Sequence, residues 1–131
     1  MTSIANLPNF LAYFGASVLL LAAFLALYTL ITPIREWQLI RQGNVAAALS
    51  LAGATIGFSL PLAAAVRSSA NFVDMLVWAA IALGLQLLCF AALYLLRRDA
   101  GQAIIRGDMA EGIFSAGLSV SLGILNAACI A

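Results

Sequence analysis

The sequence contains no histidine and no lysine, and its only charged side chains are six arginines and five acids. Without histidine, the most common side chain for proton transfer and metal binding is missing. The two cysteines, Cys89 and Cys129, stand alone, without the spacing of a metal site. A glycine-rich phosphate loop is missing as well. We therefore expect no enzyme, no metal site and no cofactor.

Charge is scarce enough to decide the class of protein. Only 8% of the residues are charged and 65% are hydrophobic, against about 25% and about 45 to 50% in soluble domains. Eleven charged side chains could not keep that much apolar surface in water, so the partner that covers it is a lipid bilayer. The net charge of +1 offers no basic footprint for nucleic acid. We expect residues 1–131 to form a single integral membrane domain.

Four apolar segments are long enough to cross a bilayer, which needs about 20 residues. The first has no arginine before it and exceeds the roughly 7 to 15 residues of a signal-peptide core, so we interpret it as an anchor. The sequence predicts an all-α membrane protein with four transmembrane helices, at residues 10–31, 44–66, 75–96 and 109–130.

The second half of the chain resembles the first. With an offset of 64 positions, Gly43 meets Gly107, Gly53 meets Gly117, and Asn44 meets Asp108. In each copy a polar entry precedes a stripe of small residues and an apolar tail. We predict two tandem helix-pair repeats, residues 1–66 and 67–131. Because each holds an even number of spans, the copies should point the same way across the membrane.

Small residues mark the expected helix contacts. Gly53, Gly57 and Pro61 are four apart and share one helix face, and such a glycine pair lets a neighbouring backbone approach closely. Pro61 should also bend its helix. The last helix keeps a weaker version in Gly117 and Ser121. We predict that these five residues pack helix against helix.

Polar residues at the helix starts resemble caps. Asn44 and Asp108 can each accept a bond from an unpaired N–H group of the first turn. Glu111 stands three residues after Asp108, as in a capping box, where its carboxylate would reach back to the cap. Glu111 could instead be an acid within the membrane on an ion or proton path.

Between the first two spans lies a short polar segment, residues 34–42. Ile34, Trp37 and Ile40 are three apart, which indicates an amphipathic turn at the headgroup level. Glu36 falls among the polar positions, and we expect it to be exposed. The segment is either an interfacial elbow or a docking surface for a soluble partner.

The arginines are distributed unevenly. The two predicted elbows contain five, and the link between the repeats contains only Arg67. The positive-inside rule places the basic elbows in the cytoplasm and both termini in the periplasm. The elbow arginines are Arg35, Arg41, Arg97, Arg98 and Arg106.

Two amides interrupt the apolar spans. Gln86 lies near the middle of the third span, where burying an unpartnered amide costs several kcal/mol. It must bond to another helix or to water. Asn126 lies nearer the end of the fourth span, where we expect it to be more easily hydrated. Interhelical bonding and a polar binding or conduction site are both compatible with this pattern.

The motifs resemble those of a known family. Its marks are the run Glu36 to Ile40, then Gly43-Asn44 with three alanines, and the ending Asn126-Ala127-Ala128-Cys129. Together with the chain length, these resemble the YjfL-like bacterial inner-membrane proteins, domain of unknown function 350. The resemblance implies a four-span protein of the bacterial inner membrane and brings no activity or catalytic residue. It also hints at peripheral partners that resemble phage-shock proteins.

We therefore favour a structural or accessory scaffold that self-associates or docks a cytoplasmic partner. Small-residue faces and interfacial elbows are what such association requires. The alternative is an oligomeric channel or transporter for ions or small polar solutes, because four helices alone hardly enclose a pore. In that case Gln86, Glu111 or Asn126 would face the oligomer axis.

Overall fold

The computed structural model describes residues 5–32, 35–97 and 99–130, and it is all-α within them. Four helices are long and apolar enough to cross a membrane, which confirms the predicted fold class. Two short helices lie between them. The six helices are α1 (Leu7–Ile31), α2 (Glu36–Arg41), α3 (Val45–Ser68), α4 (Phe72–Leu96), α5 (Ala100–Ile105) and α6 (Met109–Ile130).

Local signals explain where the spans begin. Pro8 stands in the first turn of α1, where its missing N–H group is not needed. A reciprocal cap starts α4: the Asn71 side chain accepts a bond from Asp74 N at 2.8 Å, and the Asp74 carboxylate accepts from Ala70 N at 3.0 Å. This arrangement differs from a capping box in that Asp74 bonds to the residue before the cap, and it places the start of α4 at Phe72, slightly before the predicted position.

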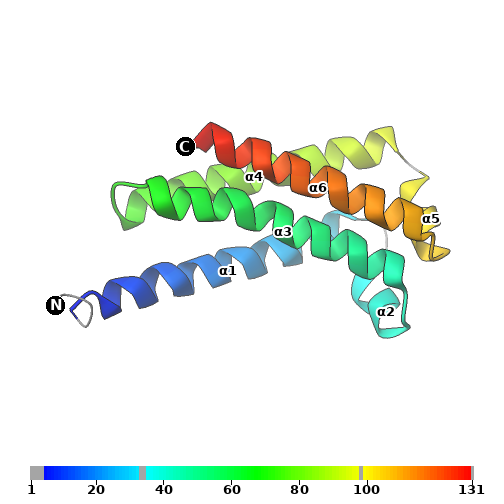
Figure 1. Ribbon diagram of the computed structural model, residues 1–131, viewed down its shortest axis with the longest axis horizontal. Coiled ribbons are helices and arrows are strands. Elements are labelled where there is room, and N and C mark those ends of the chain that lie inside the picture. The colour runs from blue at the N-terminus through cyan, green and yellow to red at the C-terminus, as the bar shows by residue number, and fades with distance from the viewer. Residues whose placement is uncertain (1–4, 33–34, 98, 131) are drawn as a thin grey trace.

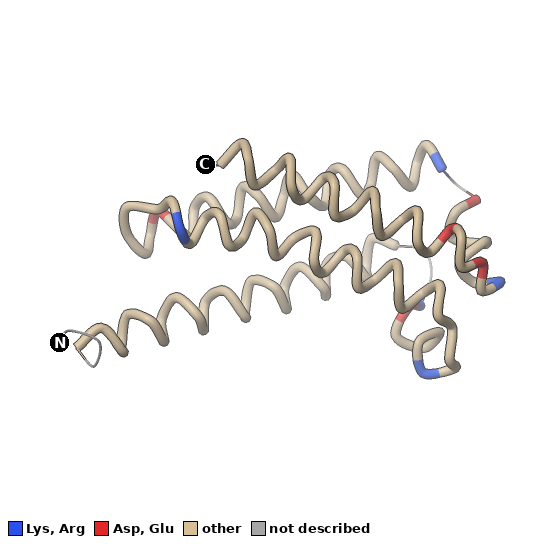
Figure 2. The backbone as a smooth tube through the Cα atoms, in the orientation of Figure 1, with Lys and Arg blue, Asp and Glu red and all other residues tan. Residues whose placement is uncertain are grey.

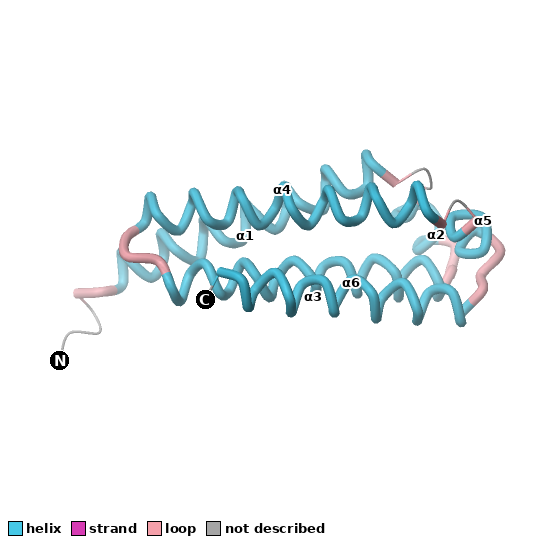
Figure 3. The backbone as a smooth tube through the Cα atoms, turned by 90° about the horizontal axis from the view of Figure 1, so that it is seen from above, coloured by secondary structure: helices cyan, strands magenta, loops and turns pink. Residues whose placement is uncertain are grey.

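The four long helices form two layers, with α1 beside α4 and α3 beside α6 (Figure 3). Helices α2 and α5 lie at one end of the bundle, and both chain ends lie at the other (Figure 1). Figure 2 shows that most charged residues gather at the end that holds α2 and α5, which we call the elbow end. Arg98 lies outside the described residues. That the elbow end faces the cytoplasm stays a prediction.

Aromatic side chains join α1 to the other layer and to α4 within its own layer. Phe24 of α1 stacks on Phe58 of α3, with ring centroids 4.7 Å apart. Tyr28 meets the edge of Phe90 of α4 at 5.1 Å. Phe24 and Tyr28 are the buried side chains of α1, so most of this helix faces outward, as expected where lipid surrounds it.

Glycines bring α3 and α6 into backbone contact. A Cβ atom on Gly53 would overlap the backbone of Ala116, and one on Gly57 would overlap the Ser119 carbonyl. From the other side, a Cβ atom on Gly123 would overlap the carbonyl of Gly57. The two helices run parallel with no room for side chains between them, which gives dense dispersion contact without a hydrophobic drive.

Pro61 is buried beside this contact and α3 continues through it. Proline has no N–H group to offer the carbonyl four residues earlier, which is that of Gly57. That carbonyl oxygen instead lies close against Gly123, where an added Cβ atom would overlap it. The predicted bend of α3 at Pro61 stays a prediction.

Gly117 and Ser121 do not pack within the chain, which corrects the expectation from the sequence. Both are exposed, and a Cβ atom on Gly117 would meet nothing within 4 Å. The face of α6 that meets α3 instead contains Gly112, Ser119 and Gly123. The repeat offset fails here because the face that α6 turns toward α3 does not match the face that α3 turns toward α6.

The two elbows share one backbone pattern. Gly43 and Gly107 adopt φ values of +86° and +81°, which glycine reaches without strain. The next residues, Asn44 and Asp108, donate their N–H groups to Leu39 and Ala103, at matching positions. Their side chains cap α3 and α6, as predicted. The duplication beyond the elbows stays a prediction.

Candidate functional site

Polar side chains inside the bundle form two groups. The elbow-end cluster lies where α1, α3, α4 and α6 approach the short helices. The mid-bundle cluster joins α4 to α6 further along the spans. The elbow-end cluster comprises Tyr28, Thr32, Glu36, Ser50, Tyr94, Arg97, Glu111 and Ser115, and the mid-bundle cluster comprises Gln86, Ser119 and Asn126.

Glu36 is buried, contrary to the exposed position expected from the sequence. Only 1% of its surface is accessible. Its Oε1 accepts a bond from the Thr32 hydroxyl at 2.5 Å, and its Oε2 is buried with no partner among the described residues. Trp37 is 52% exposed, which is compatible with the predicted place in the headgroup layer, so the correction to the elbow concerns Glu36.

Burial changes the acidity of Glu36. Removal from water raises its pKa from 4.5 to about 7, although the Thr32 bond acts in the opposite direction. The Tyr28 and Tyr94 hydroxyls lie close enough to interact with it electrostatically. Glu36 is therefore a carboxyl group that exchanges its proton near neutral pH, at the junction of three helices.

Glu111 does not form the predicted capping box. Its Oε1 accepts a bond from Arg97 Nη2 at 2.6 Å, and its Oε2 accepts one from the Ser115 hydroxyl at 2.8 Å. The Asp108 N–H group, which the box would have used, bonds to Ala103 O. Glu111 therefore ties the start of α6 to the end of α4, because pairing with a charged arginine is stronger than reaching back to a neutral amide.

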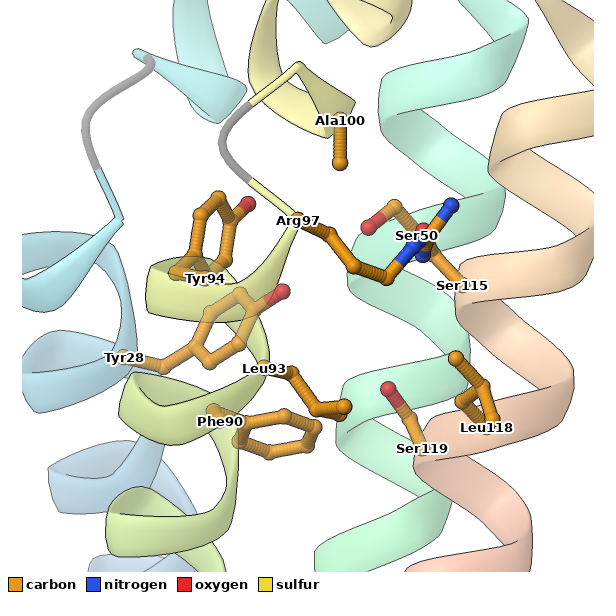
Figure 4. Close-up of a pocket in the computed structure, with 10 residues that line it drawn as sticks. All are labelled: Tyr28, Ser50, Phe90, Leu93, Tyr94, Arg97, Ala100, Ser115, Leu118 and Ser119. Atoms are coloured by element: carbon orange, nitrogen blue, oxygen red, sulfur yellow. The ribbon is translucent and has the colours of Figure 1, made fainter.

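A small cavity of about 30 Å³ lies behind this ion pair. Figure 4 shows the Arg97 side chain extending toward Ser50 and Ser115, with the hydroxyl groups of Tyr28 and Tyr94 nearby. A space of this size holds one or two water molecules, and its polar lining offers them partners. It is too small for an organic substrate.

The mid-bundle cluster satisfies both amides within one chain. Asn126 Nδ2 donates to Gln86 Oε1 at 3.1 Å and to Ala82 O at 3.2 Å, and Gln86 Nε2 donates to Ser119 O at 3.4 Å. Asn126 is only 7% exposed, so the expectation that it is readily hydrated is wrong. The close approach of α3 and α6 holds the Asn126 face of α6 toward α4.

Sequence reasoning missed Tyr28, Tyr94 and Ser50. Each looks like an ordinary span residue, and tyrosine near a span end is usually an interfacial anchor. Nothing in an apolar helix distinguishes an inward tyrosine from an outward one. Among the described residues, no group of three or more acids or cysteines could hold a metal ion.

Comparison with known proteins places this architecture in a family. The chain is 38% identical over 125 residues to the UPF0719 inner membrane protein YjfL of Escherichia coli (strain K12), covering 95% of each chain. It is 27% identical over 127 residues to the UPF0719 transmembrane protein YshE of Bacillus subtilis (strain 168), again over 95% of each. No solved structure matches. The model of the family described as Domain of Unknown Function (DUF350) matches residues 1–130, and the chain belongs to that family.

Proposed function

We propose that this protein is a non-enzymatic structural or accessory subunit of the inner membrane, and that its copies associate through the outward face of α6. This face, which we call the outer α6 face, runs the length of the helix. It comprises Phe114, Gly117, Ser121, Ile124, Leu125 and Ala128, all exposed.

The observation that supports the proposal is the open space over Gly117. Inside a helix a glycine costs about 1 kcal/mol relative to alanine, and the inner glycines of α6 offset this by close packing with α3. Gly117 gains no such contact within the chain. A second helix that approached this face would supply the missing contact.

Ser121 makes the face suitable for an apolar neighbour. Its hydroxyl donates to Gly117 O of its own helix at 2.8 Å, so burying it leaves no donor unpaired. Gly117 and Ser121 also stand at the repeat positions of Gly53 and Gly57, the residues that let α6 approach α3. The outer α6 face thus repeats a pattern that already joins helices in this protein.

The contacts of the polar residues give less support to a channel or to a docking surface for a cytoplasmic partner. Gln86 and Asn126 are buried and bonded within one chain, so they are not free to line a pore between copies. Glu36 is turned inward, so it is not offered to a cytoplasmic partner. Docking of such a partner at the elbow end would therefore have to use the exposed side chains there, such as the arginines, and not Glu36.

Energy transfer between copies tests the proposal. Donor-labelled and acceptor-labelled protein is mixed in liposomes, and transfer is followed as the protein is diluted with lipid. We expect transfer above that of random collisions. In Gly117→Leu the added side chain holds the helices apart, and we expect about a tenfold loss of apparent association, since close backbone approach supplies the contact.

The matched control is Ala52→Leu. Ala52 is also small and exposed, and it lies on α3 at the depth of Ala116 by the repeat offset. The Ala52→Leu variant should associate as strongly as the unchanged protein. Transfer at the random level for the unchanged protein, or an equal loss in both variants, would refute the proposal.

A further inference from the structure

The elbow end contains an open recess beside α2 that the proposed function does not use. Its volume is about 490 Å³, and it lies between the last turns of α1 and the short helix. Part of its rim is charged and part is aromatic. The residues that line it are Thr29, Arg35, Glu36, Trp37, Gln38 and Arg41.

The recess carries uncompensated positive charge. Arg35 and Arg41 are exposed, and among the described residues the ion pair present joins Arg97 to Glu111 instead. Glu36 lines the recess, yet its carboxyl is directed inward to Thr32, and burial raises its pKa to about 7. Two guanidinium groups are therefore free to bind an anion, and their planar donor sets match phosphate oxygens.

The position of the recess indicates which kind of anion. It lies at the bundle end where the apolar spans finish, with half-exposed Trp37 on its rim. Directly beside Thr29, Leu30 is 80% exposed and Ile31 is 41% exposed. A ligand held here would meet cations at one end and lipid-facing side chains at the other, which suits an amphiphile better than a free ion.

The second elbow offers a contrast. The corresponding recess there is lined by Arg97 and Arg106 but also by Asp99 and Glu111. Among its described lining residues the two arginines are matched by two acids, and Arg97 is already paired with Glu111. Within the part of the chain that the structure describes, two arginines without a paired acid therefore occur at the first elbow and not at the second.

We propose that the recess formed by Arg35, Trp37, Gln38 and Arg41 binds the phosphate headgroup of an anionic phospholipid. The two guanidinium groups hold the phosphate. Trp37 contacts the glycerol region, and the acyl chains run along the exposed residues at the end of α1. The site is independent of association through α6.

Trp37 provides the readout. The chain has two tryptophans, so Trp78→Phe leaves Trp37 as the single reporter. This protein is placed in nanodiscs of phosphatidylcholine that contain a small fraction of brominated phosphatidylglycerol. We expect stronger quenching of Trp37 than with the same fraction of brominated phosphatidylcholine. Replacing both arginines, as Arg35→Gln with Arg41→Gln, should weaken the apparent affinity at least about tenfold.

Control variants and competition by free phosphate test whether the recess selects an anionic phospholipid. Arg106→Gln removes an exposed arginine from the balanced elbow and should leave quenching within about twofold. Arg35→Lys with Arg41→Lys keeps the charge and should retain part of the preference. Equal quenching by both lipids, or unchanged affinity in the double glutamine variant, overturns the proposal. Competition by millimolar inorganic phosphate also overturns it, because the recess would then select a free ion.

Discussion

Gly123→Ala is expected to destabilise the protein by about 2 kcal/mol in net terms, although alanine is the better helix former. The added methyl group would overlap the Gly57 carbonyl. A backbone atom cannot rotate away as a side chain can, so α3 and α6 must separate along their contact. Overpacking of this kind costs about 1 to 3 kcal/mol or more, and it outweighs the roughly 1 kcal/mol gained in helix propensity.

The matched control is Gly117→Ala on the same helix, where the methyl group enters open space. It should be neutral or stabilise by up to about 1 kcal/mol. Both are measured by reversible denaturation in dilute mixed micelles, where copies are separated. If the two substitutions had equal effects, the parallel contact of α3 and α6 described above would be wrong.

Glu36→Gln is expected to stabilise the protein at alkaline pH and to have little effect at acid pH. The folded protein holds the Glu36 proton up to a pKa of about 7, whereas the unfolded chain releases it near 4.5. Stability from this group is therefore complete below about pH 4.5 and is lost as the pH rises through 7. Glutamine is uncharged at every pH and has nearly the same shape as the protonated carboxyl group.

The advantage of Glu36→Gln should grow by about 2 kcal/mol between pH 5.5 and pH 8.5. The groups that face Glu36 are the hydroxyls of Thr32, Tyr28 and Tyr94, with Arg35 on its own elbow. Denaturation in mixed micelles at the two pH values measures the difference. Glu111→Gln, which removes a carboxylate paired with Arg97, should destabilise instead. An advantage independent of pH would contradict the buried position of Glu36.

The positions of the helices could be predicted from the sequence because they depend on quantities that a sequence contains. A span must be apolar over the thickness of a bilayer, and the spans start and end within three residues of their predicted bounds. Asn44 and Asp108 could be identified as caps because a short polar side chain before an apolar run satisfies the first turn locally. None of this requires knowledge of distant contacts.

The rotation of each helix could not be predicted, and the errors have that common cause. In water a polar face marks the outside of a helix, but in lipid both faces are apolar. Helix α6 carries small residues on two sides, with Gly112 and Gly123 on one and Gly117 and Ser121 on the other. Only packing against α3 shows which pair is inside. The repeat offset favoured Gly117 and Ser121, which face outward within this chain.

Glu36 was misplaced for a related reason. A charged residue type normally indicates exposure, and the amphipathic pattern of residues 34–42 agreed. At a membrane surface, however, the layer outside the protein favours Trp37, so the elbow turns its acid inward and burial raises the pKa of the carboxyl to about 7. The Thr32 hydroxyl donates a hydrogen bond to Glu36. In the sequence Pro33 lies between these two residues, and because proline normally interrupts a helix, helical spacing does not predict that their side chains meet.

Disulfide crosslinking at Ser121 tests the proposed association most directly. With both native cysteines replaced by alanine, Ser121→Cys puts one small thiol on the outer α6 face, and Ile56→Cys puts one on exposed α3 at similar depth. After mild oxidation in native membranes, we predict a covalent dimer for Ser121→Cys and monomer for Ile56→Cys. Monomer for both, or equal dimer for both, would contradict the account.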